Sequence, residues 1–470
     1  MDWSERAPTL ALILGYVAAQ VALGVWIGRR VHSSSDYYLA GRSLGALPIA
    51  LSLFATWFGA ETVLGASGAI AAEGLSGARA EPFGYALCLT AMAFLIAVPF
   101  RARGYLTIAD FFRERFDRRN ELAAAVITAL VSIIWAGAQL LALSAILSVT
   151  LGLPSLVTVI AAAVVVILYA SFGGLLSDVA TDVVQGGVLL VGLASLLVAL
   201  AFALNGLSGM LGAIRPEQLR LIGPGEGVFA RLDAWSIPIL GSLVTQEAIA
   251  RFAGARDAET AKRGCLGAAA LYLVVGLVPV LIALAGVHLL PLPEEQDRFL
   301  PLLVEELLAP IWSVLLMAAL LSALLSTVDS NILSVSALVT QNLRAGAGSL
   351  ALARGTTAGA GLVALAIAIA TLLSGDAIYD LIELSSVLGQ AGLLVAVLIG
   401  LFSRFGGPIA SLAAILACAV CNLYVYALFP LFSGDPEAEL PGGFLLSVLV
   451  SVLAYAAAGW WEGARAKAPA

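Results

Sequence analysis

Five carboxylates stand inside long apolar stretches of this chain, and packing alone does not explain them. A charged side chain is costly inside a membrane, and none of the five has a Lys or Arg at its own depth in its span. Bound cations or buried hydrogen bonds must therefore compensate for their burial. The five residues are Glu61, Asp178, Asp182, Glu247 and Asp329.

Hydroxyl groups gather around one of these carboxylates. Ser326 lies three residues before Asp329 and four before Ser330, so the three side chains share one face of a helix. Hydroxyl and carboxylate oxygens are hard ligands that suit a small hard cation such as Na⁺. Hydroxyls that bond back to the carbonyl four residues earlier are the alternative. That alternative suits Ser334 and Ser336 but does not explain the Asp329 carboxylate.

A second polar stretch follows Gly173-Gly174, which we expect to form a tight turn. Asp178 lies within about one helical turn of this point, so we expect solvent to reach it. Asp182 lies deeper and shares its helix face with Gln185. Asp182 is therefore the better candidate for a functional site.

The composition excludes a soluble protein. Of 470 residues, 61% are apolar and 12% are charged, about half the ~25% typical of soluble domains. Two histidines make His-based catalysis or a His metal cluster improbable, and Cys418 and Cys421 are expected to fill the core. A net charge of −7 with no basic patch excludes a nucleic-acid partner. The composition predicts an all-α polytopic membrane protein.

Windows of about 20 apolar residues predict about 13 transmembrane helices. The ninth is longer than a bilayer and should contain a bend or an extra interfacial segment. We expect residues 1–470 to form a single membrane domain, with an extra N-terminal helix (9–28), a core (45–402) and two C-terminal helices (408–461). The predicted spans are 9–28, 45–72, 82–100, 122–150, 155–172, 176–205, 233–252, 264–289, 302–342, 356–374, 377–402, 408–430 and 442–461.

The basic residues predict the orientation of these spans. With the N-terminus outside, 18 of the 24 Lys and Arg residues fall on the inner side, and Arg251 is counted among them. Inner loops carry such an excess. We therefore expect a multi-pass protein of the plasma (inner) membrane with its N-terminus outside and its C-terminus in the cytoplasm.

Two predicted spans are interrupted by small, polar and helix-breaking residues. One interruption covers residues 55–62, and the other runs from Ile237-Pro238 through Ser242. Paired broken helices at corresponding positions of two inverted five-helix halves form the binding site of many secondary transporters. Close helix packing at Gly and Ser is the alternative.

Three motifs in this order resemble the sodium:solute symporter family. They are Asp36-Tyr37-Tyr38-Leu39-Ala40-Gly41-Arg42-Ser43, the stretch from Gly173-Gly174 through Thr181-Asp182 to Gln185, and Leu325-Ser326-Thr327-Val328-Asp329-Ser330. The resemblance covers nearly the whole chain. It implies a leucine-transporter-type fold, a 5+5 inverted repeat with discontinuous helices that works by alternating access.

The resemblance also implies where Na⁺ would bind. The first site would use the carbonyls of Ala55, Phe58 and Ala323 with the hydroxyls of Ser326 and Thr327. Some members use a second site, and its positions here are Asp182, Ser326, Asp329 and Ser330.

Within the family, the chain is most similar to the choline-transporter branch, which surrounds an ammonium group with aromatic rings. Trp57, Tyr85 and Trp135 match three positions of that cage, while Thr245 and Ile382 stand where the branch has Trp. The implied substrate-binding residues are Trp57, Glu61, Tyr85, Trp135, Gln246 and Glu247.

We therefore expect a Na⁺-coupled symporter that imports a small organic solute, either an amino acid or a small choline-like amine. A proton-coupled transporter of the same fold is the main alternative, ahead of a channel or a membrane sensor. An enzyme is not expected, because Asp178 and Asp182 lie on one helix and no Ser/His pair is available. The expected ligands are the solute and Na⁺ within the lipid bilayer, with no obligatory protein partner.

Overall fold

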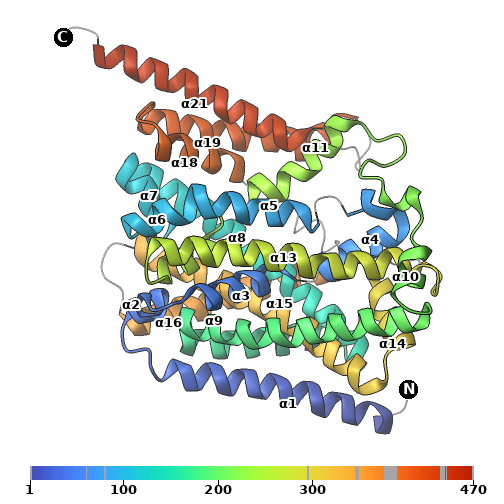
Figure 1. The fold of residues 1–470 in the computed structure, drawn as a ribbon. Coiled ribbons are helices and arrows are strands. Elements are labelled where there is room, and N and C mark those ends of the chain that lie inside the picture. The colour runs from blue at the N-terminus through green and yellow to red at the C-terminus, as the bar shows by residue number, and fades with distance from the viewer. Residues whose placement is uncertain are drawn as a thin grey trace.

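The structure is a computed structural model that describes residues 3–59, 61–78, 81–293, 296–344, 349–374, 389–433, 440 and 442–467. Helices make up nearly all of this part of the chain, as predicted (Figure 1). The first part contains α1 (Trp3–Gly28), α2 (Ser34–Leu39), η1 (Ala40–Arg42), α3 (Ala46–Trp57), η2 (Glu61–Gly65), α4 (Ala66–Glu73), η3 (Gly74–Ser76), α5 (Phe83–Met92), η4 (Ala93–Ala97), α6 (Val98–Arg103), α7 (Ile108–Arg115), α8 (Arg118–Leu151) and α9 (Ser155–Ala203).

The second part repeats this alternation of long and broken helices. It contains α10 (Leu207–Ala213), η5 (Pro216–Leu219), α11 (Val228–Ser236), η6 (Ile237–Gly241), α12 (Gln246–Gly254), α13 (Ala258–Gly286), η7 (Gln296–Arg298), α14 (Phe299–Leu307), α15 (Pro310–Leu338), η8 (Val339–Leu343), α16 (Leu350–Ser374), α18 (Gln390–Phe402), α19 (Pro408–Leu423), η9 (Tyr424–Leu428), α20 (Phe429–Ser433) and α21 (Gly443–Lys467).

Nine helices within the described ranges are long and apolar enough to cross a membrane, which agrees with a polytopic protein. Shorter apolar helices at Leu14–Gly28, Ala46–Trp57 and Gln390–Phe402 cover parts of three further predicted spans. Residues 375–388, which include Ile382, lie outside the described residues. The structure therefore supports the predicted class of fold without fixing the number of spans at 13.

α9 has 49 residues, about 74 Å at 1.5 Å per residue, which is far longer than a bilayer. Its helical geometry fails at Gly174, where φ is 57° and ψ is −160°. Only glycine adopts this backbone conformation readily, and a Cβ at Gly174 would also clash with the backbone oxygen of Tyr37. The break predicted at Gly173-Gly174 thus separates two span-length segments, and the second carries Asp178 and Asp182.

The overlong ninth span is divided, as expected. α14 ends at Leu307, Leu308 and Ala309 adopt extended backbone angles, and Pro310 begins α15. Proline suits the first turn of a helix because the amide that it lacks would have no helical partner there. α15 then carries the whole hydroxyl-rich stretch.

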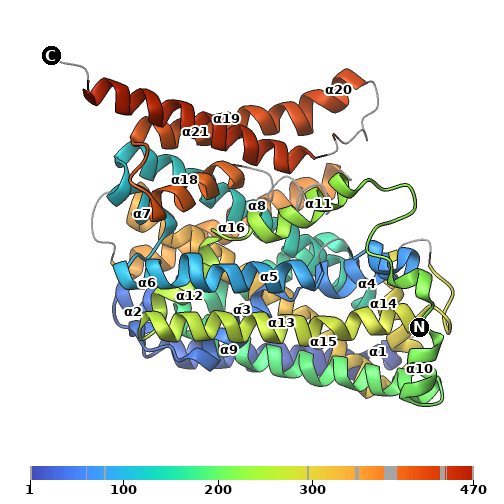
Figure 2. The same ribbon diagram turned by 45° about the horizontal axis from the view of Figure 1, so that its top comes forward.

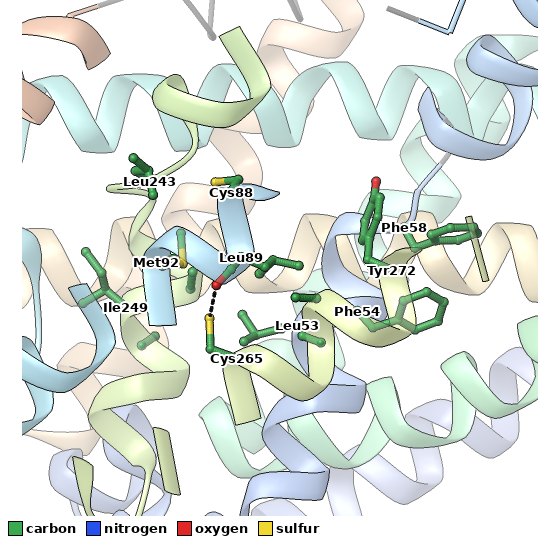
Figure 3. Close-up of a cluster of buried hydrophobic side chains, with 14 of the residues drawn as sticks. Leu53, Phe54, Phe58, Cys88, Leu89, Met92, Leu243, Ile249, Cys265 and Tyr272 are labelled. Atoms are coloured by element: carbon green, nitrogen blue, oxygen red, sulfur yellow. Dashed lines mark hydrogen bonds between the residues drawn. The ribbon is translucent and has the colours of Figure 1, made fainter. Parts of the chain in front are cut away.

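The core packs α3 against α13, and α13 against α5 (Figures 2 and 3). The rings of Phe54 and Phe58 contact Tyr272 with centroids 6.4 and 5.4 Å apart. Cys265 donates a 3.1 Å hydrogen bond to the Leu89 carbonyl. All four cysteines are free and buried, which confirms the expectation that Cys418 and Cys421 fill the core.

The remaining helices lie around this core. α1 lies against α9, while α19 and α21 pair at one edge in both views (Figures 1 and 2). The start of α1 and the end of α21 lie at opposite ends of the bundle along the helix direction (Figure 1).

α13 begins at the N-cap Asp257, whose carboxylate accepts a hydrogen bond from the Thr260 amide. That bond holds the pKa of Asp257 below its ordinary value.

Candidate functional site

The first broken helix ends at Trp57. Phe58 leaves the helical region with φ −84° and ψ 65°, and the chain resumes as the π-helical turn η2. The last carbonyls of a helix lack amide partners within it. One of them, the Thr56 carbonyl, accepts a 2.8 Å hydrogen bond from the Thr327 hydroxyl of α15. The same hydroxyl lies 3.0 Å from the Ala323 carbonyl.

All five residues of the first predicted Na⁺ site are buried, and α3 and α15 bring them into one region. Thr327 contacts the end of α3 directly, whereas the Ser326 hydroxyl donates to Asp182. A Cβ on Gly59 would lie 3.7 Å from the Thr327 hydroxyl, so the chain after the break also passes close to this oxygen. The side chain of Glu61 lies outside the described residues.

The second broken helix runs through α11 and the π-helical turn η6, and α12 begins at Gln246. Both interruptions therefore fall where the sequence predicts them. A side-chain contact joins the two breaks, because the Trp57 indole donates a 3.2 Å hydrogen bond to a Glu247 carboxylate oxygen.

Aromatic rings extend from this contact. Trp57 and Tyr85 lie edge to face with centroids 5.6 Å apart, and Tyr85 lies 5.4 Å from Tyr272. Trp135 lies on α8 and is partly exposed. Within the described residues, no ring contact joins Trp135 to Trp57 or Tyr85.

Glu81 and Tyr272 complete this cluster and were missed in the sequence. The Tyr272 hydroxyl lies 3.2 and 3.1 Å from the two Glu81 carboxylate oxygens and 2.7 Å from the Thr62 hydroxyl. Thr62 donates a 3.0 Å hydrogen bond to Glu81. Glu81 precedes α5 in a segment whose residues predict a loop, so nothing in the local sequence indicates that this carboxylate is buried.

Gln246 has backbone partners for both ends of its side-chain amide. Its oxygen accepts from the Ile108 amide at 2.9 Å, and its nitrogen donates to the Leu106 carbonyl at 3.1 Å. These contacts fix the start of α12 to the segment between α6 and α7.

Arg251 of α12 forms a buried ion pair that the sequence reading did not anticipate. Its Nη2 atom lies 2.9 Å from Asp178 and 3.0 Å from Asp182. The expectation that Asp178 is solvated is wrong, because only 3% of this residue is exposed. Counting Arg251 as an inner-surface charge is also wrong, because 1% of it is exposed. The carboxylates of α9 therefore have a basic partner, but it comes from a different helix.

The second predicted Na⁺ site surrounds this ion pair. Ser52 and Ser326 each donate to an oxygen of Asp182. Ser330 donates to Asp178 at 2.9 Å. Asp329 is also buried, but neither of its carboxylate oxygens has a hydrogen-bond partner among the described residues.

Known structures share this fold. A substrate-bound, outward-open Na⁺-coupled sialic acid symporter superimposes with a TM-score of 0.82 over 96% of both chains, at 18% identity. Mhp1, a nucleobase-cation-symport-1 family transporter, gives 0.60 over 91% of this chain and 94% of its own, at 15% identity. These likenesses confirm the leucine-transporter-type fold.

Curated relatives match most of the chain. The high affinity choline transporter 1 of Homo sapiens is 28% identical over 360 residues, which cover 71% of this chain and 61% of that protein. The sodium/pantothenate symporter of Escherichia coli (strain K12) is 23% identical over 352 residues, covering 70% and 71%. The chain spans about three fifths of the length of the choline transporters that it matches.

The match to the family's sequence pattern covers residues 37–405, which include both broken helices, α9 and α15. These elements hold the ion pair, the hydroxyl cluster and the aromatic cluster. The chain belongs to the sodium:solute symporter family.

Proposed function

We propose that this protein is a Na⁺-coupled secondary active symporter that imports a small organic solute by alternating access. The observation that carries the proposal is the contact between the Thr327 hydroxyl and the Thr56 carbonyl at the end of the broken helix α3. This contact brings a carbonyl oxygen from the end of α3 and a hydroxyl of α15 together between two helices. Na⁺ prefers such hard oxygen ligands.

The first Na⁺ would be held by the carbonyls of Ala55, Phe58 and Ala323 and the hydroxyls of Ser326 and Thr327. Thr327 now donates to two carbonyls. An ion held by the predicted ligands would turn the Thr327 hydroxyl oxygen towards itself, and so tie α3 to α15. Na⁺ favours the outward-open state only if it binds that state more tightly.

The solute would bind between the two breaks. Trp57, Tyr85 and Tyr272 offer ring faces, and Glu247 and Glu81 border them with carboxylates. Ring faces and carboxylates both attract cations. A small amine or an amino acid bound through its ammonium group suits this lining, and Glu61 and Trp135 remain predicted contacts. We assign Gln246 to holding the loop before α7 rather than the solute.

Alternating access would then couple the two ligands. Na⁺ entry from outside is favoured by about 2.3 kcal/mol per charge for each 100 mV of inside-negative potential.

The orientation with the N-terminus outside and the C-terminus in the cytoplasm of a plasma membrane is part of this proposal. α1 begins and α21 ends at opposite ends of the bundle, as termini on opposite sides of a membrane would (Figure 1).

A proton-coupled transporter of the same fold is the second candidate, and the buried Asp329 favours it because a carboxylate can take up and release a proton. The hydroxyl of Thr327 favours Na⁺ instead, because a hydroxyl can coordinate a metal ion but does not take up or release a proton near neutral pH.

The test is the Na⁺ dependence of thermal stability in Thr327→Ala and Ser326→Ala. Removing a ligand to a charged group costs about 1.5–3 kcal/mol, so the Na⁺ concentration for half-maximal stabilisation should rise roughly ten- to hundredfold. Thr371→Ala removes a hydroxyl that only bonds back to Ile367 on α16 and is the control. An unchanged Na⁺ response in both variants would contradict the proposal that Ser326 and Thr327 bind Na⁺.

A further inference from the structure

We propose that the Arg251 guanidinium is a built-in cation that fills the second predicted Na⁺ site, so that a single Na⁺ binds in each transport cycle. This inference rests on the proposed function, because it concerns how many ions that function uses.

The contacts of Arg251 resemble the oxygen shell of a bound metal ion. Four side-chain oxygens lie 2.7–3.0 Å from Nη2, one oxygen lies 3.0 Å from Nε and the Glu247 carbonyl lies 2.9 Å from Nη1. A guanidinium has five N–H donors and accepts nothing, so every partner is an oxygen that a cation would also attract. The five side chains are Ser52, Thr56, Asp178, Asp182 and Ser330.

These oxygens include those of two of the four residues expected to bind the second Na⁺. Asp182 and Ser330 are direct partners of Arg251, and Ser326 donates to the other oxygen of Asp182. A Na⁺ at this point would have to displace a cation that is attached to the chain and always close by. A tethered group competes at a high effective concentration, and the guanidinium is always charged.

The burial of the cluster makes the resident cation necessary. Asp178 is 3% exposed, Asp182 is 0% exposed and Arg251 is 1% exposed. Neither carboxylate tolerates this burial as an anion unless a cation is paired with it. Arg251 supplies one such charge permanently, so it balances one of the two carboxylates without an ion from solution.

Arg251 also joins more helices than a Na⁺ at the second site would. The predicted second-site residues lie only on α9 and α15, whereas Arg251 reaches from α12 to α3, α9 and α15. It therefore connects the inner half of the second broken helix to the first. Thr56 links this cluster to the first Na⁺ site, because its hydroxyl accepts from Arg251 and its carbonyl accepts from Thr327.

The experiment counts Na⁺ ions without using a solute. Thermal stability of the purified protein is measured against NaCl concentration, with KCl keeping the ionic strength constant. Well above Kd, stability rises in proportion to the logarithm of the Na⁺ concentration and to the number of ions bound. The expected result is a one-ion slope for the unmodified protein and for Arg251→Lys, which keeps the charge.

Arg251→Gln removes the resident cation and should open the second site, so the slope against the logarithm of Na⁺ should double. Arg263→Gln is the matched control, because Arg263 is exposed and pairs only with Glu259 one turn away on α13. It should keep the one-ion slope. If Arg251→Gln does not fold, Arg251→Gln is combined with Asp178→Asn, which removes one carboxylate together with its partner.

A two-ion slope in the unmodified protein overturns the inference while leaving Na⁺ coupling intact. A one-ion slope in Arg251→Gln, or in the double variant where Arg251→Gln does not fold, also overturns it, because Arg251 would then have a purely structural role. No response to Na⁺ in the unmodified protein contradicts the proposed function itself, and the one-ion inference falls with it.

Discussion

At the scale of single residues, the two breaks are connected by one indole. Trp57 donates to Glu247 across the gap and contacts Tyr85 with its ring. Its hydrogen bond and its ring face are separable properties, because phenylalanine keeps a ring but has no donor. Their separate contributions decide whether this residue binds the solute or only packs.

Trp57→Ala should weaken binding of an amine about 2- to 30-fold, because a ring face contributes about 0.5–2 kcal/mol to holding a cation. Trp57→Phe should lose less, since a ring face remains. The measurement is the solute concentration that gives half-maximal thermal stabilisation in NaCl. Equal solute affinities in the unmodified protein, Trp57→Ala and Trp57→Phe would show that Trp57 only packs.

Tyr272→Phe removes the hydroxyl that contacts Glu81 and Thr62 but keeps the ring beside Tyr85. Loss of a hydrogen bond to a charged group costs about 1.5–3 kcal/mol. The free energy of unfolding should therefore fall by up to this amount. Solute affinity should also fall, because Glu81 loses a contact that positions it, while the Na⁺ response stays the same. A matching loss of Na⁺ response would show instead that the change disturbs the whole core.

At the scale of elements, the break in α9 sets the position of Asp178 and Asp182. Gly174→Ala should lower the free energy of unfolding by at least about 2 kcal/mol, because the new Cβ meets a strained backbone and the Tyr37 oxygen. Gly187→Ala on the same helix is the control, since a Cβ there meets nothing within 4 Å. Thermal melts compare the two, and equal stability would mean that the break is not required.

The sequence predicted the features that depend on local pattern. Apolar run length gave the spans, and the small and polar residues of 55–62 and 237–242 marked the two breaks. The partner of Asp178 was not predictable in this way. Arg251 is followed by Arg256, Lys262 and Arg263, which is the ordinary pattern of a basic inner loop. Only the packing of α12 against α3 and α9 reveals that its side chain points inwards.

At the scale of the whole molecule, alternating access requires one end of the pathway to close while the other opens. Arg101, at the end of α6, donates to the carbonyls of Ala255 and Arg256 beyond α12 at 2.7 and 2.9 Å. Leu44, just before α3, also exchanges backbone hydrogen bonds with this segment. Under the proposed orientation this end faces the cytoplasm, and we expect these contacts to break when the solute is released there.

Arg101→Ala should favour the state that is open at this end. A cysteine introduced as Ala250→Cys, which is buried on α12, should then react several times faster with a small polar thiol reagent. Arg103→Ala removes the same charge and is the control, because no hydrogen bond joins the Arg103 side chain to another described residue. Equal rates in the two backgrounds would contradict a gating role for Arg101.

The central claim is that Na⁺ drives solute accumulation. The most direct measurement uses proteoliposomes loaded with KCl and diluted into NaCl or KCl, with an amine or amino acid that stabilises the purified protein. We expect the solute to accumulate transiently above its external concentration in NaCl only. This accumulation should be lost in Thr327→Ala. Equal uptake in NaCl and KCl would contradict Na⁺ coupling.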